Sequence, residues 1–327
     1  MKEKLVEFAR RTSLRQLRAL GAVARTGGVG AAAELLSVTP PAVAQQLRLL
    51  EDALGGVPLF ERTPAGARPT DAGREALSAL GRVEAALADC AAAVEALRGM
   101  EGGRVAVGVV STAKYFAPFA LAAFGRAHPK VEMRLLVGNR QQTVAALEAF
   151  DLDVAVMGYP PEHFAVERVV IGDHPHVIIA PPGHPLARRR GVPLRDAARE
   201  PFLLREPGSG TRDLMRRLFA AADLPAGPRM EIGSNETIKQ AVMAGMGVAL
   251  ISAHTIAAEV RDGRLAILDV EGLPVVRQWF AVRRAEKRLL PAAQALWDHL
   301  ARTGALFLPQ TPVARPAPAA GLRRRRG

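Results

Sequence analysis

Two adjacent prolines near the N-terminus, Pro40 and Pro41, constrain the fold of this chain more than any other feature. A proline fixes its own φ and lacks an N–H, so a helix tolerates it only in the first turn. Thr39, directly before them, is a favoured N-cap residue. The sequence therefore predicts a helix that starts at Pro40. Its apolar residues recur at the helical spacings of 4, 3 and 4, at Val43, Leu47, Leu50 and Leu54.

Two short helical segments precede this helix. Residues 14–24 carry an apolar face and are followed by a pair of glycines, and residues 30–36 are rich in alanines that allow close packing. Two short helices joined by a tight turn are typical of a helix-turn-helix. The polar side of the helix after Thr39 presents Gln45, Arg48 and, at its margin, Gln46, and these side chains can pair with adenine and guanine in a DNA major groove. The alternative is a plain helical bundle whose polar face meets water.

The residues after this helix favour DNA binding over a plain bundle. Residues 57–62 predict a short strand, 63–68 contain a turn with glycine, and a capped helix begins at Thr70 or Asp71. This arrangement predicts a small β-hairpin wing, on which arginines can contact the phosphates of a DNA backbone. With Thr39 and Pro41 at the start of the helix, the predicted DNA-binding residues are Thr39, Pro41, Gln45, Gln46, Arg48, Arg62 and Arg68.

The charge of the chain agrees with a polyanionic partner. The formal net charge is +12, and residues 1–70 contribute ten Lys and Arg against six Asp and Glu, a net of +4. Five further arginines lie in the last 16 residues, which we expect to be disordered. A single cysteine, Cys90, excludes an internal disulfide framework. With neither a signal peptide nor a membrane span apparent, we expect a cytoplasmic protein with no membrane partner.

A long helix without proline follows the wing. Its apolar positions are spaced 3, 4, 3, 4 and 3 residues apart, the a/d spacing that pairs helices, at Leu80, Val83, Leu87, Cys90, Val94 and Leu97. We therefore predict a dimerisation helix over residues 71–100. The alternative is an amphipathic helix that lies on its own domain. Cys90 is interpreted as a small hydrophobic residue of this seam.

From about residue 102 to residue 308, strand-like apolar runs alternate with helical runs, which predicts an α/β fold. The strand candidates are residues 104–110, 131–137, 153–157, 176–180, 201–204, 248–251 and 278–283, and the helix candidates are 114–127, 141–149, 212–222 and 236–244. About 200 residues are enough for one large domain or two lobes. The expected domains are a winged helix-turn-helix (1–70), a dimerisation helix (71–100), a two-lobed effector domain (101–310) and a basic tail (311–327).

Four predicted strand-to-helix turns are rich in Ser, Thr, Asn and Gly. Helix N-termini offer free N–H groups and a positive dipole end, so such turns can hold an anion at the carboxyl ends of strands. Singly, each turn is explained as well by an ordinary N-cap. Together they favour a cleft between two lobes. The predicted effector-binding residues are Ser111, Thr112, Lys114, Gln142, Thr143, Ser209, Thr211, Arg212, Asn235 and Glu236, and Arg140 suits an anion as well.

The sequence lacks the motifs of several other chemistries. Residues 28–33 imitate a dinucleotide-binding glycine pattern, but that pattern must follow a strand, and the preceding segment is helical. His174, His176 and His184 have no cysteine or carboxylate cluster beside them that would complete a metal site. Nucleophile elbows, Walker loops and HExxH motifs are absent from the sequence. We therefore expect no metal, no cofactor and no catalytic residues. An α/β enzyme and a solute-binding protein remain the alternative classes.

The chain resembles the LysR-type transcriptional regulators over nearly its whole length. The runs that carry the resemblance are 32–43 (AAELLSVTPPAV), Gln45-Gln46, Leu50-Glu51, Leu54-Gly55, 59–62 (LFER) and 70–73 (TDAG). The chain departs from the family pattern at Ala44, where many members carry serine, and at the extra glycine of Gly55–Gly56. Within the family, the runs 111–118 (STAKYFAP), 233–242 (GSNETIKQAV) and 243–255 look most like the CbbR subgroup.

The resemblance implies a function and partners. Members of the family bind dyad-symmetric promoter DNA as dimers or, usually, tetramers, and engage RNA polymerase. Their two-lobed effector domains are of the periplasmic-binding-protein type. The CbbR subgroup controls Calvin-cycle (RuBisCO) genes and responds to phosphorylated sugars, phosphoenolpyruvate or nicotinamide dinucleotides such as NADPH. The resemblance therefore implies a metabolite-responsive regulator of carbon-fixation genes, with regulation of another metabolic operon through a different effector as the alternative. The sequence leaves the effector, the target promoters and the direction of regulation open.

Overall fold

The computed structural model describes residues 10–64, 66–97, 102–225 and 230–311. Two compact units can be separated, with the boundary near residue 99. We call them the N-terminal unit and the C-terminal unit and describe each by itself. The expected basic tail beyond residue 311 lies outside the described residues.

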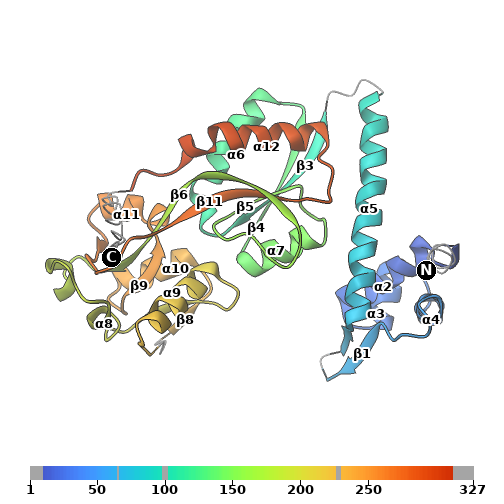
Figure 1. Ribbon diagram of the computed structural model, residues 1–327, viewed down its shortest axis with the longest axis horizontal. Helices are drawn as coiled ribbons and strands as arrows, with labels where there is room; N and C mark the ends of the chain where they lie inside the picture. The colour runs from blue at the N-terminus through green and yellow to red at the C-terminus, as the bar shows by residue number, and fades with distance from the viewer. Residues whose placement is uncertain (1–9, 65, 98–101, 226–229, 312–327) are drawn as a thin grey trace, which may run out of the picture. The chain divides into compact units, whose positions relative to one another are not determined.

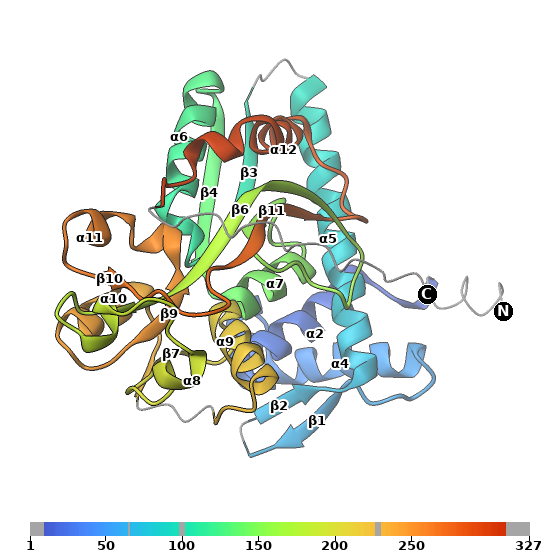
Figure 2. The same cartoon turned by 60° about the vertical axis from the view of Figure 1, so that its left-hand side comes forward.

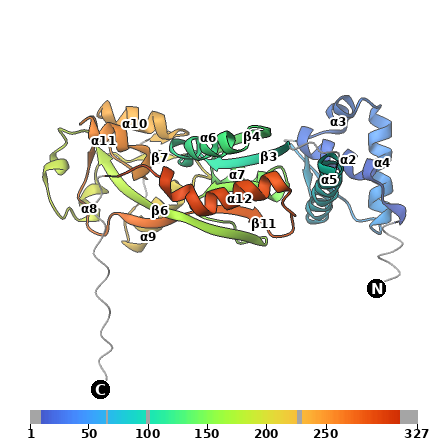
Figure 3. The ribbon, with the colours of Figure 1, turned by 90° about the horizontal axis from the view of Figure 1, so that it is seen from above.

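The described part of the N-terminal unit contains short helices, a hairpin and one long helix, namely α2 (Leu14–Thr26), α3 (Val29–Leu36), α4 (Pro40–Ala53), β1 (Phe60–Thr63), β2 (Gly66–Pro69) and α5 (Asp71–Leu97). Figure 3 shows α2, α3 and α4 beside α5, which is seen along its axis. Ser13 and Gln16 form a capping box at the start of α2, and Gly27 ends that helix in the left-handed region at φ 76°. The shared core is apolar and includes Leu20, Val23 and Leu50. This order confirms the predicted winged helix-turn-helix.

Two glycines fix the hairpin against the helices (Figure 2). Gly66 has φ 111°, and a Cβ at this position would lie 2.7 Å from the carbonyl oxygen of Gly27. The next amide, of Ala67, donates to that same carbonyl at 2.8 Å. Gly73, in the first turn of α5, lies so close to Leu59 that a Cβ would be 2.1 Å from its carbonyl oxygen. Only glycine permits these approaches, so the wing is held at a defined position beside α2 and α5.

The C-terminal unit alternates strands and helices. The strands are β3 (Gly103–Val110), β4 (Val131–Gly138), β5 (Val154–Met157), β6 (Val166–Ala180), β7 (Leu203–Arg205), β8 (Met230–Ile232), β9 (Ala249–Ser252), β10 (Ala266–Ile267) and β11 (Val275–Arg284). The α-helices are α6 (Ala117–Ala127), α7 (Arg140–Glu148), α8 (Leu194–Ala197), α9 (Gly210–Ala221), α10 (Asn235–Met243), α11 (Ala257–Arg261) and α12 (Pro291–Thr303). Short 3₁₀ helices span Ala113–Tyr115, Pro185–Arg188, Ala253–Thr255 and Gly304–Phe307.

Two long strands, β6 and β11, join two lobes (Figure 1). The sheet order is β10-β6-β11-β5-β3-β4, and β9 also pairs with β6. Lobe 1 contains β3, β4 and β5 with α6, α7 and α12, and lobe 2 contains β7 to β10 with α8 to α11. β3 pairs in parallel with β4 and β5, whereas β6 and β11 pair antiparallel along their length with a register shift at Trp279/Phe280. The predicted two-lobed α/β architecture is confirmed.

Each lobe has its own apolar core. The core of lobe 1 is packed around Phe116, Phe124 and Trp279, each at most 1% exposed. Lobe 2 has two clusters on opposite sides of its strands, one around Phe202 and Phe219 and the other formed mainly by aliphatic residues. Separate cores mean that each lobe can keep its packing when the angle between the lobes changes.

Most predicted elements are present, with one large difference. Residues 176–180 form only the second part of β6, which begins ten residues earlier at Val166. The first part of β6 was not among the predicted strands, and it contains Gly172 and Pro175, residue types that are rare in the interior of strands. Among the described helices, none combines the length and the apolar character that a membrane span requires.

Candidate DNA-binding surface and ligand cleft

Helix α4 separates an apolar side from an exposed polar side. Val43 and Leu50 are at most 1% exposed and belong to the core of the N-terminal unit. Gln45 and Arg48 are exposed, and Gln46 is half-buried at the margin between them. The helix therefore presents amide and guanidinium groups, the groups that can pair with purine edges in a major groove.

The start of α4 leaves its polar atoms accessible. Thr39 is the N-cap residue with extended backbone, but its side chain makes no capping hydrogen bond. Both Thr39 and Pro41 are exposed. The predicted cap position is therefore present without the expected hydroxyl contact to the helix. An exposed hydroxyl beside a helix N-terminus can donate to a DNA phosphate.

The wing carries its two arginines on exposed positions. β1 and β2 pair antiparallel, with Arg62 opposite Ala67 and Glu61 opposite Arg68. Both arginines are exposed. The Arg68 guanidinium lies 3.8 Å from the Glu61 carboxylate, and both side chains are more than half exposed. Such a pair is weak, so it does not prevent Arg68 from contacting a phosphate.

The predicted dimerisation seam on α5 is mostly exposed in the single chain. Val83, Leu87 and Val94 are 39%, 49% and 43% exposed, and Cys90 is exposed as well. Leu80 differs, because it is 5% exposed and packs in the core of the N-terminal unit. The side chain of Leu97 lies outside the described residues. An apolar row at heptad spacing that meets solvent is what a partner helix would cover.

A narrow pocket, with about 30 Å³ of free volume, lies where the two lobes of the C-terminal unit meet. Lobe 1 contributes the ends of β3, β4 and β5, lobe 2 contributes β7 and the start of α9, and the connecting strands β6 and β11 also line it. We call this pocket the cleft. Its lining residues are Val110, Ser111, Thr112, Asn139, Arg140, Met157, Gly158, Tyr159, His174, His176, Arg205, Ser209, Gly210, Thr211 and Arg277.

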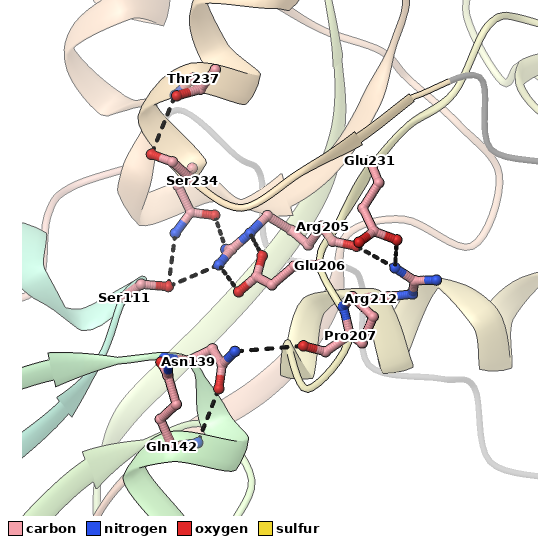
Figure 4. Close-up of polar contacts among 11 residues, drawn as sticks. Ser111, Asn139, Gln142, Arg205, Glu206, Pro207, Arg212, Glu231, Ser234 and Thr237 are labelled. Carbon is pink, nitrogen blue, oxygen red and sulfur yellow. Dashed lines mark hydrogen bonds and ion pairs between the residues drawn. The ribbon is translucent and has the colours of Figure 1, made fainter. Parts of the chain in front are cut away.

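Arg205, which the sequence analysis did not select, is the central charged group of the cleft (Figure 4). Its side chain is 2% exposed and forms a two-pronged ion pair with Glu206, at 2.8 and 2.9 Å. It also donates to the hydroxyl of Ser111 at 3.1 Å, across the lobes, and to the side chain of Asn235. Through these hydrogen bonds Arg205 connects the lobes and orients Ser111. It adds little net charge to the cleft, because the Glu206 carboxylate balances the charge of its guanidinium group.

The four predicted anion-binding turns fall into two kinds. At α7 the Asn139 and Gln142 side chains cap each other's backbone amides at 2.9 and 3.0 Å. At α10 the hydroxyl of Ser234 accepts the Thr237 amide at 3.4 Å. The turns at Thr112 and Ser209 have no side-chain capping bond. Two turns are therefore occupied by their own caps, and two are open toward the cleft.

Of the ten predicted effector residues, four line the cleft: Ser111, Thr112, Ser209 and Thr211. The other six have partners elsewhere. Gln142 caps α7, and the hydroxyl of Thr143 donates to the Asn139 carbonyl at 2.8 Å. Arg212 donates to the Arg205 carbonyl at 2.9 Å and pairs with Glu231. The side-chain oxygen of Asn235 accepts a hydrogen bond from Arg205.

Lys114 and Glu236 belong to a separate polar cluster around Tyr115. The Tyr115 hydroxyl donates to Glu236 at 3.0 Å, and the Lys114 ammonium lies 5.3 Å from the ring centre. The buried Lys239 joins this cluster through ion pairs to Glu236 and Glu259 at 2.9 and 2.8 Å. Burial, followed by the charge of Glu236, raises the pKa of Tyr115 far above its usual range. The cluster links the lobes without facing the cleft.

His174 and His176 line the cleft, and the rings of Trp279 and His254 stack with His174. His174 stacks on Trp279 with ring centres 3.7 Å apart, and Trp279 donates to Nδ1 of His254 at 3.0 Å. Burial lowers the pKa of His176 to about 3 and that of His254 to about 4, and it lowers the pKa of His174 well below its usual value. All three imidazoles are therefore neutral at pH 7. Both ring nitrogens of His174 are buried without a hydrogen-bond partner among the described residues.

The cleft residues that sequence analysis missed come from β5, β6, β7 and β11. Arg205 was visible as a charge that ends the apolar run 202–204 just before a glycine-rich turn. His174 and His176 were considered only as metal ligands. Tyr159 and Arg277 carry no local pattern of their own, since the pairing of β11 with β5 and β6 brings them together.

Comparison with known proteins assigns the family. Residues 14–74 match the model of the bacterial regulatory helix-turn-helix proteins of the lysR family, and residues 98–305 match the LysR substrate binding domain. These matches cover both units described above. The chain belongs to the LysR family of transcriptional regulators.

Particular relatives are similar over most of their length. The chain is 56% identical over 302 residues to the HTH-type transcriptional regulator CbbR of Xanthobacter flavus, covering 92% of this chain and 90% of that protein. It is 43% identical to the RuBisCO operon transcriptional regulator of Allochromatium vinosum, covering 86% of this chain and 93% of that protein.

Two solved structures are also similar. The regulatory domain of CcmR from Synechocystis PCC6803, in complex with 2-PG, matches with a TM-score of 0.59 and 36% identity, covering 61% of this chain and 96% of that one. Full-length CbnR complexed with its target DNA matches with a TM-score of 0.58 and 23% identity, covering 89% of this chain and all of that one. At this identity the likeness to CbnR shows the fold alone.

Proposed function

We propose that this protein binds the promoters of carbon-fixation genes, a RuBisCO operon among them, and alters their transcription when a small anionic metabolite occupies the cleft. The observation that carries this proposal is the 56% identity to CbbR of Xanthobacter flavus across 92% of the chain. The 43% identity to the RuBisCO operon transcriptional regulator of Allochromatium vinosum supports it further. We propose the cytoplasm as its compartment, because bacterial promoter DNA lies there.

In this proposal α4 lies in a DNA major groove. Gln45 and Arg48 contact base edges, and Gln46, at the margin, supports them. Thr39 and Pro41 approach the backbone at the start of the helix, and Arg62 and Arg68 of the wing contact phosphates. The exposure of these side chains supports the assignment, since each can reach DNA without a change in the protein core.

We further propose that α5 pairs with the α5 of a second copy. The exposed row Val83, Leu87, Cys90 and Val94, with Leu97 at its end, supplies the apolar contact. Pairing places two α4 helices on one dyad-symmetric site, which matches the symmetry of a palindromic promoter. Tetramer formation and contact with RNA polymerase belong to the same proposal.

The ligand site that the contacts favour is formed by the two open turns. Ser111 and Thr112 face it from lobe 1, and Ser209 and Thr211 face it from the N-terminus of α9 in lobe 2. Hydroxyls and amides at a helix start suit a phosphate or a carboxylate. The cleft has about 30 Å³ of free volume, well below the range of ligand pockets, which favours a small metabolite over a dinucleotide. The 2-PG complex of the CcmR regulatory domain supports this size class.

His174 is the strongest candidate for a neutral hydrogen-bond contact to this ligand. A buried imidazole with two unpartnered nitrogens is costly, because each polar atom has lost its water. A bound ligand that accepts a hydrogen bond from His174 removes part of that cost. The depressed pKa of His174 keeps the ring neutral, so it adds selectivity for an acceptor group without adding charge.

The DNA-binding part is tested by fluorescence anisotropy with the full chain and labelled DNA from upstream of a RuBisCO operon in its source organism. We expect binding to that DNA to exceed binding to a shuffled sequence by about a thousandfold or more at moderate salt. Equal affinity for both sequences would contradict the proposal.

The ligand part is tested by thermal unfolding with 2-PG and other small phosphorylated acids, using a matched pair of serine variants. Ser209→Ala removes a hydroxyl that faces the cleft, and we expect about a tenfold weaker ligand affinity. Ser234→Ala removes the capping hydroxyl of α10, which does not face the cleft. It should lower stability while keeping the ligand affinity. Equal losses of affinity in both variants would reject the open-turn site.

A further inference from the structure

A second hollow lies beside the cleft and shares three residues with it. It is open to solvent, has about 470 Å³ of free volume and is lined by Gly158, Tyr159, Pro160, Glu162, Arg168, Leu214, Arg217, Arg277, Gln278 and Phe280. We call it the Tyr159 groove. Gly158, Tyr159 and Arg277 also line the cleft. The two spaces therefore meet at one tyrosine and one arginine.

Three arginines from three elements line this groove, and a fourth, Arg140 of the adjoining cleft, shares the Tyr159 ring with two of them. Arg140 from α7, Arg277 from β11 and Arg217 from α9 lie 4.7, 4.9 and 5.6 Å from the centre of the Tyr159 ring. Arg168 of β6 lies 5.5 Å from the centre of the Phe280 ring. Cations over aromatic faces gain modest stabilisation, but mutual repulsion opposes their gathering around one ring.

Most of these charges lack a counterion. Arg168, Arg217 and Arg277 form no ion pair or hydrogen bond with any described residue, whereas Arg205, Arg212 and Arg283 of the same unit each pair with a glutamate. Arg140 is held in place by donating to the carbonyls of Tyr159 and Pro160 at 3.0 and 3.4 Å. The guanidinium groups thus point into one hollow without carboxylate partners.

The nearby carboxylates do not cancel this charge. Glu162 accepts a hydrogen bond from the Tyr159 hydroxyl at 2.9 Å, and the charge of Asp213 acts on Arg277. The lining residues themselves comprise three guanidinium groups and one carboxylate, which leaves a net charge of +2 at the groove. Burial, together with the charges of Arg217 and Arg140, lowers the pKa of Arg277, which reports the same surplus of positive charge.

We propose that the Tyr159 groove is a second anion-binding site, separate from the cleft, that takes a small phosphorylated molecule with at least two negative charges. Arginines recognise phosphoryl oxygens through paired N–H groups. Their convergence on a single ring suits a compact anion better than an extended polyanion such as DNA. Leu214, Pro160 and Phe280 add an apolar wall for the remainder of such a ligand.

Occupation of this groove would act on the angle between the lobes. Arg217 and Leu214 belong to α9 of lobe 2, whereas Tyr159 and Pro160 follow β5 of lobe 1. A dianion that contacts both sides stabilises the arrangement in which they are close. Since Tyr159 and Arg277 line both spaces, a ligand in the groove changes the affinity of the cleft for its own ligand, and the reverse holds by linkage. This coupling rests on the proposed function of the cleft, but anion binding to the groove does not.

The test is calorimetric titration of the full chain with inorganic pyrophosphate. Arg168→Gln and Arg217→Gln change exposed side chains that lie outside the cleft, and we expect each to weaken pyrophosphate binding by about tenfold. Arg126→Gln, an exposed charge on α6 that lines neither space, is the matched control and should keep the affinity. Thermal unfolding shows that each variant is folded.

Three outcomes would overturn the proposal. An unchanged affinity in Arg168→Gln and Arg217→Gln would show that the groove does not bind the anion. An equal loss in Arg126→Gln would show only a general effect of charge. Complete loss in Ser209→Ala would place pyrophosphate in the cleft alone, and would support the proposed function while rejecting the second site. Retained groove binding in a chain that fails to bind promoter DNA would reject the proposed function instead.

Discussion

The N-terminal unit and the C-terminal unit place their candidate binding residues in opposite environments. On α4 and the wing, Gln45, Arg48 and Arg62 are exposed, and the core packs behind them without their help. In the cleft, Arg205 and His174 are at most 4% exposed and are part of the packing between the lobes. In the N-terminal unit, the candidate DNA-binding side chains can therefore be changed without loss of stability. In the cleft, a change to a candidate ligand-binding side chain also affects stability. The following predictions test this difference.

The largest effect is expected at Arg205. Arg205→Met leaves Glu206 and Asn235 without their buried partner, and loss of one member of such a pair costs about 3–5 kcal/mol. We expect the free energy of unfolding to fall by this order, together with loss of the ligand response. Urea unfolding followed by tryptophan fluorescence measures it, because both tryptophans, Trp279 and Trp297, lie in the C-terminal unit. A variant that keeps full stability but loses the ligand response would contradict the proposal that Arg205 contributes to both the packing between the lobes and ligand binding.

Acid should destabilise the C-terminal unit selectively. Burial depresses the pKa of His176 to about 3 and of His254 to about 4, below the unfolded value near 6.5. The unfolded chain therefore binds protons first, so stability is fully present above about pH 6.5 and falls as the pH decreases toward 4. The expected slope between pH 6 and 5 is about 1 kcal/mol per pH unit for each histidine.

The same urea experiment at pH 7, 6 and 5 measures this slope. His254→Gln should reduce the slope, whereas His128→Gln, at an exposed position after α6, is the control and should not. All seven histidines follow residue 127, so the N-terminal unit has none. A pH-independent stability between 7 and 5 would contradict the buried neutral histidines.

At α4 we expect a change in recognition without a change in stability. Arg48→Ala removes an exposed guanidinium and should lower the discrimination between promoter and shuffled DNA by about 1–3 kcal/mol. The free energy of unfolding should stay within about 0.5 kcal/mol of the parent protein. Anisotropy with both DNAs and urea unfolding provide the two numbers. A large loss of stability would show that α4 is as integrated as the cleft.

The smallest effect is expected at the wing. Arg62→Ala should weaken binding to promoter and shuffled DNA alike, because a phosphate contact carries no sequence information. It should lower the slope of log affinity against log salt by about 1. Salt titrations of the anisotropy signal check this. A selective loss for promoter DNA would assign Arg62 a base contact instead.

The same contrast between the N-terminal unit and the cleft explains which features could be predicted from the sequence. The start of α4 was predictable because Pro40 fixes the backbone locally at the first helical position, although the Thr39 hydroxyl makes no capping bond. The wing was predictable because its arginines lie within a few residues of the turn. In the cleft, residues of two of the four polar turns, Ser111 and Thr112 and Ser209 and Thr211, line the pocket, and their role in ligand binding stays a prediction. The other two are closed by their own side chains, and a sequence pattern does not distinguish a cap from an open site.

The remaining cleft residues depend on strand register. Tyr159 and Arg277 are more than a hundred residues apart, and they meet because β11 pairs with β5 and β6. The register shift at Trp279/Phe280 then decides which side chains of β11 face the cleft. Such long-range pairing has no local signature. The first part of β6 was missed for a related reason, since Gly172 and Pro175 resemble a loop until a partner strand holds them.

The two strands that cross between the lobes restrict how this domain can move. β6 and β11 are hydrogen-bonded to each other from one lobe into the other, interrupted by a single irregular step. A ribbon of this kind resists sharp folding but twists and bends gradually. A ligand bound in the cleft would therefore reach the other lobe as a small torsion of a stiff connector, rather than as a wide swing about a loose joint.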